Sequence, residues 1–171
     1  GGGKSYTVSK LIESLIETDN KAILIDATGE YSRFDSLDLC QECNLGIEYY
    51  YHYSNLSISD LFLMFRPSGQ VQQPILLEAI NSLKLARILE SNKETYTITE
   101  EDTKITYSFK GQKSEILSIE VNDGCIVKQG KPTKPFNRLC AKYSDELNNF
   151  NQLNFEIKNL TKQINNECFQ I

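Results

Sequence analysis

Residues 1–17 read GGGKSYTVSKLIESLIE, and Gly3-Lys4-Ser5 within them matches the end of the phosphate-binding pattern G-x-x-x-x-G-K-[ST]. In that pattern glycines let successive backbone N–H groups face a phosphate, the lysine reaches the β- and γ-phosphates, and the hydroxyl ligates Mg²⁺. The match therefore predicts a phosphate-binding loop with a Mg²⁺ ligand at Ser5. The residues expected to bind the nucleotide are Gly1, Gly2, Gly3, Lys4, Ser5 and Tyr6.

The sequence after the glycines has the order of elements that this motif requires. Apolar residues recur at helical spacing over residues 5–18, and the positive dipole end of that helix would face the phosphates. Residues 21–26 (KAILID) predict a strand buried on both faces of a parallel sheet, and residues 27–31 a loop. The alternative, glycines as a linker and Lys4 as an ordinary surface lysine, is disfavoured by this order.

Local patterns predict the remaining elements. Apolar residues alternate with polar ones on either side of residues 100–102, which indicates a polar-faced β-hairpin, and Asn122-Asp123-Gly124 is typical of a tight turn. The expected elements are a strand over 46–53, helices over 60–65 and 74–90, the hairpin from 95, further strand over 116–127, a loop over 131–135 and a helix over 154–171.

Two stretches resemble the motor domain of the HerA-like branch of the HerA/FtsK ATPases, which reads G-K-S-x-T-V and later, after a strand, I-D-P-H-G-E-Y. The residues that fit are Lys4, Ser5, Thr7, Val8, Ile25, Asp26, Gly29, Glu30 and Tyr31. Ala27 and Thr28 stand where Pro and His are usual, which puts the role of that His in doubt here. Residues 56–65 and 75–85 resemble the helical part inserted into that domain, and residues 155–167 resemble the helix before its Walker B strand; we match residues 95–135 to no part of it.

The resemblance implies an ATP-driven motor that uses ATP and Mg²⁺, assembles as a homo-hexameric ring and pulls duplex DNA through its pore. It also implies a nuclease or effector subunit as a partner. Lys4, Asp26 and Glu30 would be catalytic, the two acids lying on the γ-phosphate side of the phosphate-binding loop. The alternative is that Asp26 is only a charge at the end of a strand, and that Glu30 is a helix-capping or solvated carboxylate.

The expected fold class is α/β: a partial RecA-like P-loop NTPase with a parallel sheet, flanking helices, and a helical and a β-hairpin insertion. We expect residues 1–53 to form the front part of the ATPase core, 54–94 a helical insertion, 95–140 a β-rich insertion, and 141–171 a return to the core as the helix before the Walker B strand. We also expect the sequence to start inside its phosphate-binding loop and to be truncated at both ends. Unpaired sheet edges would then favour self-association.

Hydrolysis in such an enzyme requires a Walker B strand that ends in acidic residues. Residues 116–120 (ILSIE) are the internal candidate, but they lie in the expected insertion and are interrupted by a serine. We therefore expect the chain alone not to hydrolyse ATP. Two other classes stay open, namely another P-loop enzyme such as a small kinase or GTPase, and a non-catalytic oligomerisation or adaptor module.

Composition further narrows the classes of protein to which this chain could belong. Of the 171 residues 40% are hydrophobic and 24% charged, which is typical of a globular chain. The formal net charge of −5 is not the basic signature of a DNA-coating protein. No apolar run approaches the roughly 18 residues of a membrane helix, and the five cysteines have irregular spacing, so we expect a cytoplasmic protein with reduced thiols.

Three further patterns are given little weight. The C-x-x-C of residues 40–43 lacks a second pair and predicts free thiols rather than a zinc site. His52 lies among tyrosines, which predicts packing in a strand rather than catalysis. Lys128, Lys131 and Lys134 predict a solvated basic loop, with a DNA contact as the alternative.

Overall fold

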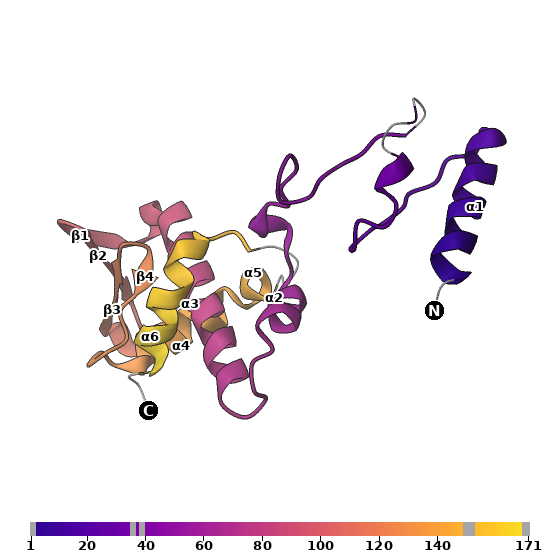
Figure 1. Cartoon of the computed structure of the whole chain (residues 1–171). Coiled ribbons are helices and arrows are strands. Elements are labelled where there is room, and N and C mark those ends of the chain that lie inside the picture. Colours follow the sequence, from indigo (N-terminus) through magenta and orange to yellow (C-terminus); the bar gives the residue numbers. More distant parts are fainter. Residues whose placement is uncertain (1–2, 35–36, 38–39, 149–152, 169–171) are drawn as a thin grey trace. The chain divides into compact units, whose positions relative to one another are not determined.

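The computed structural model describes residues 3–34, 37, 40–148 and 153–168 (Figure 1). The chain forms two compact units, Gly1–Tyr51 (unit 1) and His52–Ile171 (unit 2). Unit 1 begins with α1 (Gly3–Glu17), which confirms the helix predicted over residues 5–18. Asp19, with φ of 56°, turns the chain out of this helix. Ser9 is the one buried residue of α1.

The buried strand predicted over residues 21–26 is wrong for this structure. No strand is assigned there, and Ile23 and Ile25 are 95% and 89% exposed. A strand of a parallel sheet obtains its hydrogen bonds and its covering helices from segments elsewhere in the chain. No described segment pairs with residues 21–26, so the apolar composition of the run does not lead to burial.

The strand predicted over residues 46–53 is also wrong. Gly46 has φ of 88°, and the chain turns back there through an isolated bridge between Leu45 and Tyr49. The Tyr49 N–H donates to the Asn44 carbonyl at 3.1 Å. A glycine in the left-handed region favours a tight turn, and this local preference prevails over the β-propensity of the tyrosines.

Unit 2 contains a four-stranded antiparallel sheet in the order β1-β2-β3-β4. The strands are β1 (Thr97–Glu101), β2 (Lys104–Lys110), β3 (Ile116–Asn122) and β4 (Cys125–Ile126). They confirm the predicted hairpin and the predicted turn, because Asp123 and Gly124 have φ of 49° and 74°, as a two-residue type I′ turn requires. The parallel sheet of the expected fold class is not confirmed, since these strands follow one another through tight connections rather than through crossover helices.

Two helices of unit 2 agree with the sequence analysis. α2 (Ile58–Phe65) and α3 (Gln72–Ser91) confirm the helices predicted over 60–65 and 74–90. Ser57 starts α2 through a reciprocal cap: the Asp60 N–H donates to the Ser57 hydroxyl, and the Ser57 N–H donates to the Asp60 carboxylate at 2.7 Å. Arg66, with φ of 46°, ends α2.

The C-terminal helices differ more from expectation. α4 (Thr133–Lys142) and α5 (Ser144–Leu147) were not predicted. α4 starts inside the loop expected over 131–135, because Pro135 lies in its first turn, where a missing N–H costs little. α6 (Leu160–Cys168) is shorter than the helix predicted over 154–171, of which residues 169–171 lie outside the described residues.

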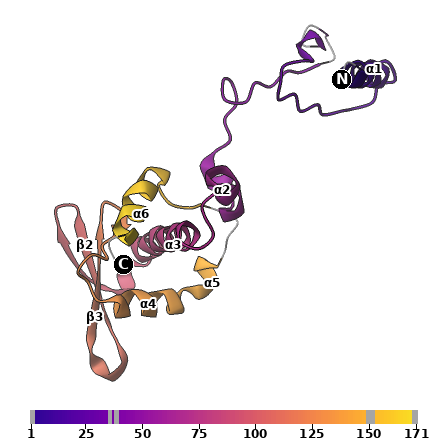
Figure 2. The ribbon, with the colours of Figure 1, turned by 60° about the horizontal axis from the view of Figure 1, so that its bottom comes forward.

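The helix α3 is central to unit 2, and Figure 2 shows it with α6 on one side and α4 on the other. One apolar cluster packs it against the sheet, α4 and α5; its members include Leu85, Leu89, Tyr107, Ile126 and Leu139. A second cluster joins it to α2, β4 and α6; its members include Leu61, Ile80, Leu83, Cys125 and Leu160. Nine of the 20 residues of α3 are buried, which is why its sequence is apolar on several sides.

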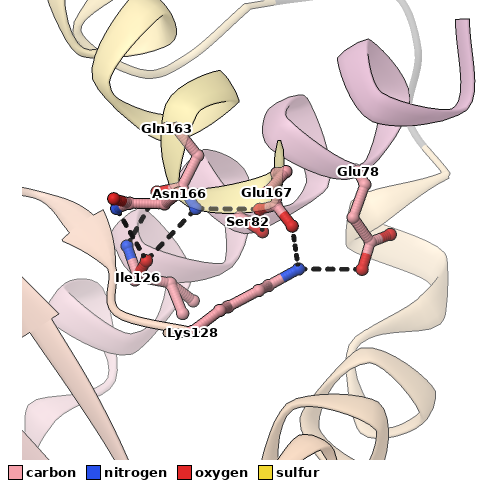
Figure 3. Close-up of polar contacts among 7 residues, drawn as sticks. All are labelled: Glu78, Ser82, Ile126, Lys128, Gln163, Asn166 and Glu167. Carbon is pink, nitrogen blue, oxygen red and sulfur yellow. Dashed lines mark hydrogen bonds and ion pairs between the residues drawn. The ribbon is translucent and has the colours of Figure 1, made fainter. Parts of the chain in front are cut away.

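A buried polar network connects α3, α6 and the segment after β4 (Figure 3). The Glu167 carboxylate accepts hydrogen bonds from the Ser82 hydroxyl at 2.7 Å, the Gln163 amide at 2.8 Å and the Lys128 ammonium at 2.7 Å. Lys128 also pairs with Glu78 at 2.8 Å. Because a buried charge is tolerated only when it is paired and hydrogen-bonded, this network fixes how the three segments meet.

The same network protects an edge of the sheet. The Ile126 N–H donates to the Gln163 side-chain carbonyl at 2.9 Å, and the Gln163 and Asn166 amides both donate to the Ile126 carbonyl at 3.2 Å. A side-chain amide thus takes the place of a neighbouring strand. Unpaired edge groups of this kind otherwise invite association with other chains.

The three lysines of the expected basic loop have different surroundings from those predicted. Lys128 is 5% exposed and belongs to the buried network, so the prediction that it is solvated is wrong. Lys131 pairs with Glu120 at 3.0 Å and Lys134 with Glu115 at 2.6 Å. Each positive charge has a carboxylate partner, which weakens the electrostatic attraction that this loop offers to DNA.

We predict that Lys128→Met lowers the free energy of unfolding by about 3–5 kcal/mol, because it leaves a buried Glu167 carboxylate without its cation. Urea unfolding followed by circular dichroism measures the loss. The matched control is Lys131→Met, which removes a half-exposed ion pair and costs below about 1 kcal/mol. Adding Glu167→Leu to Lys128→Met should restore part of the stability. Equal losses in Lys128→Met and Lys131→Met would contradict this account of the network.

Candidate functional site

The candidate site lies in unit 1, where the first turn of α1 meets the loop of residues 26–31. The Ser5 hydroxyl donates a hydrogen bond to the Glu30 carboxylate, with 2.6 Å between Oγ and Oε2. Ser5 is half-buried and Glu30 is exposed. A hydroxyl and a carboxylate oxygen so close together are the hard oxygen groups that Mg²⁺ prefers.

Asp26 organises the loop that carries Glu30. Its Oδ1 accepts hydrogen bonds from the Thr28 N–H at 3.1 Å, the Thr28 hydroxyl at 3.2 Å and the Gly29 N–H at 2.9 Å. Its Oδ2 accepts from the Tyr31 N–H at 2.9 Å. The Tyr31 N–H contributes most to holding the pKa of the Asp26 carboxyl below its usual value. Gly29, with φ of 73°, has the backbone freedom that this turn demands.

A second contact joins α1 to the same segment. Glu13 on α1 pairs with Arg33 at 3.0 Å and with Lys10 at 2.6 Å. Eight residues separate Glu13 from Ser5, which is about 12 Å along a helix. The segment of residues 26–34 is therefore fastened to α1 at two separate points. The sequence analysis missed the Glu13–Arg33 pair, because no local pattern relates residues 20 positions apart.

The other predicted nucleotide ligands lie at the start of α1. Gly3 is the first residue of the helix, and Lys4 is exposed one position before Ser5. Lys4 forms no ion pair with any residue that the structure describes. Tyr6 is 65% exposed, with its ring 5.9 Å from the Lys10 ammonium. Gly1 and Gly2 lie outside the described residues. Lys4 thus leaves its cation available where a phosphate would lie in the predicted motif.

The remaining candidates belong to unit 2. His52 caps the short 3-10 turn Tyr53–Asn55, with its Nδ1 2.7 Å from the Ser54 hydroxyl, so the prediction that it packs in a strand is wrong. Residues 116–120 belong to the antiparallel strand β3, where Glu120 pairs with Lys131. No group of three His, Cys, Asp or Glu side chains able to hold a metal ion occurs within residues 3–34, 37, 40–148 and 153–168.

Unit 2 also has a hollow of about 410 Å³, between β3 and the start of α4. Apolar side chains such as Ile119 and Phe136 line it together with Lys128 and Glu120. These two charged groups already have partners, namely Glu167 for Lys128 and Lys131 for Glu120. The hollow therefore supplies no unpaired charge, in contrast to Lys4 in unit 1.

A glycine-lysine-serine sequence that opens a helix, with an acidic loop beside the serine, is typical of P-loop ATPases. A comparison with protein families agrees: the family described as the central domain of helicase HerA matches residues 1–170. The chain therefore belongs to the HerA central-domain family, and the resemblance noted in its sequence is confirmed. No curated protein and no solved structure matched. No helix among the described residues is long and apolar enough to cross a membrane.

The five cysteines are free thiols with different surroundings. Cys43 and Cys168 are exposed. Burial raises the pKa of the Cys140 thiol from 9.0 to about 11, with the nearby Glu78 carboxylate acting in the same direction. Because the thiolate is the nucleophile, burial protects Cys140 from alkylation.

We predict that iodoacetamide at pH 8 modifies the exposed Cys43 and Cys168 first and Cys140 at least about 10-fold more slowly. Burial raises the pKa of Cys140 to about 11, which lowers its thiolate fraction, and the greater nucleophilicity of a high-pKa thiolate offsets part of that loss. Mass spectrometry of quenched samples measures each rate. In guanidinium chloride all the cysteines should react at similar rates. Fast modification of Cys140 in the folded chain would show that its surroundings are misassigned.

Proposed function

We propose that this chain provides the ATP-binding part of a HerA-like, DNA-translocating ATPase. Membership of the family supports an ATPase of the P-loop class. The observation that carries the proposal for this chain is the Ser5–Glu30 hydrogen bond beside the available Lys4. Lys4 and the hydrogen-bonded pair Ser5–Glu30 lie in the first turn of a 15-residue helix or directly against it, where the helix dipole favours bound anions.

Different residues of this site bind the phosphates and the Mg²⁺ ion. The N–H groups of the first turn of α1 and the Lys4 ammonium hold the phosphates of ATP, and the Ser5 hydroxyl oxygen ligates Mg²⁺. The fit to Mg²⁺ rests on the hard hydroxyl oxygen of Ser5, whose proton the Glu30 carboxylate accepts at 2.6 Å. When bound, the ion neutralises phosphate charge. Glu30 is hydrogen-bonded to Ser5 and so lies next to the proposed Mg²⁺ ligand.

The finer features of the proposal are those that the family resemblance suggests. They are a parallel RecA-like sheet, a homo-hexameric ring and duplex DNA in its pore. Ile23 and Ile25 support the first of these, because two almost fully exposed isoleucines in one short run are costly in water and suit a strand that other segments cover. A net charge of −5 indicates that DNA would contact a limited part of the surface rather than all of it.

A binding measurement on the 171-residue chain tests the nucleotide site. We predict that the chain binds a fluorescent ATP analogue in the presence of Mg²⁺, and that Lys4→Ala weakens binding about 10- to 100-fold, the usual worth of a charged hydrogen bond. The control is Lys10→Ala, which removes an exposed lysine of the same helix that already pairs with Glu13. If both variants bind as tightly as the unmodified chain, the site is wrongly placed.

A separate measurement tests the motor. In a longer polypeptide that carries this chain, ATP hydrolysis should rise when duplex DNA is added and should be abolished by Lys4→Ala. Nucleotide binding without DNA-stimulated turnover would favour the non-catalytic module instead.

A further inference from the structure

The Ser5 hydroxyl has one proton and two oxygen lone pairs. In this structure the proton is directed to Glu30 Oε2 at 2.6 Å. A hydroxyl that donates its proton in one direction presents its lone pairs in others, and a negatively charged acceptor also increases the basicity of the oxygen. Partners of this kind orient metal ligands and strengthen metal binding without touching the metal.

The position of Glu30 is in turn set by Asp26. Both oxygens of the Asp26 carboxylate are occupied by hydrogen bonds from the loop, three at Oδ1 and one at Oδ2. These bonds come from residues on both sides of Glu30, namely Gly29 and Tyr31. The carboxylate of Asp26 therefore holds the backbone that carries Glu30, and in this conformation it is engaged within its own loop.

We propose that Glu30 and Asp26 are positioning residues for Mg²⁺ rather than catalytic residues. By accepting the Ser5 proton, Glu30 leaves the hydroxyl lone pairs for the ion, and Asp26 acts through Glu30 by folding the loop of residues 26–31. This inference rests on the proposed function, because it concerns the ion that accompanies ATP. It differs from the roles that the family resemblance implies for the two acids.

The test is the gain in affinity that Mg²⁺ confers. A fluorescent ATP analogue is titrated into the 171-residue chain in EDTA and again in excess Mg²⁺, and the ratio of the two dissociation constants is the Mg²⁺-dependent gain. Glu30→Ala should reduce this gain about 10- to 100-fold, the usual effect of losing a partner that orients a metal ligand. The affinity in EDTA should not fall, because Glu30→Ala removes a negative charge beside the phosphates; a general loss of structure would lower it.

Two further variants separate positioning from structure. Glu30→Gln keeps a side-chain oxygen that can accept the Ser5 proton and should retain more of the gain than Glu30→Ala. Asp26→Asn should reduce the gain, but adding it to Glu30→Ala should reduce it no further, because Asp26 acts through Glu30. Glu17→Ala is the matched control: it removes an exposed carboxylate at the other end of α1, away from Ser5 along the helix, and it should leave the gain unaltered.

The outcomes distinguish this inference from the proposed function. If the unmodified chain binds no nucleotide in either buffer, the proposed function fails and the inference fails with it. If it binds with a clear Mg²⁺-dependent gain and Glu30→Ala retains that gain, the positioning role is overturned while the nucleotide site stands. If Asp26→Asn and Glu30→Ala have fully additive effects, Asp26 does not act through Glu30.

Discussion

The buried carboxylate of Glu167 is the constraint on which most of unit 2 depends. A negative charge in a protein interior must be matched by donors, and here they come from Ser82 on α3, from Gln163 on α6, and from Lys128 after β4. Satisfying this one group requires α6 to lie against α3. Gln163 is then also placed to complete the edge of β4. The apolar clusters supply stability, and the polar network selects the arrangement in which the helices and the sheet meet.

Unit 1 is held together in a different way. Ser9 and Phe34 are its buried residues among those described, while Ile23 and Ile25 remain exposed. Because the apolar core is so small, polar contacts hold the segment of residues 26–34 against α1. These contacts are the Asp26 turn, the Ser5–Glu30 hydrogen bond and the Glu13–Arg33 pair. The arrangement of the candidate site therefore depends on a few hydrogen bonds, which makes each carboxylate in it experimentally informative.

The sequence predicted the elements whose signals are local. The helix after Gly3-Lys4-Ser5, the long helix beginning near Pro74 and the turn at Asp123-Gly124 follow from periodicity and turn chemistry within a few residues. The strand expected over 21–26 is wrong because a strand requires neighbours, which apolar composition alone does not provide. The strand expected over 46–53 is wrong because the chain turns at Gly46. The buried Lys128 was missed because lysines close together in sequence usually indicate a solvated surface.

Part of the candidate site was also predicted, because part of its signal is local in sequence. Lys4 and Ser5 follow from a short motif, and Glu30 was identified through a family resemblance that the comparison confirms. That Glu30 accepts the Ser5 proton, 25 positions away, is a fact of three-dimensional structure that spacing does not reveal. The many hydrogen bonds of Asp26 are equally invisible in sequence, because they depend on how the backbone of the loop turns.

Hydrogen–deuterium exchange of the 171-residue chain, with and without ATP and Mg²⁺, shows whether the nucleotide binds at the start of α1. If the phosphates lie there with the acidic loop beside them, peptides covering residues 3–17 and 26–34 should exchange more slowly. Exchange in peptides of unit 2 should be unchanged, and these peptides serve as an internal control. Protection confined to unit 2, or no protection at saturating nucleotide, would contradict the assignment of this site.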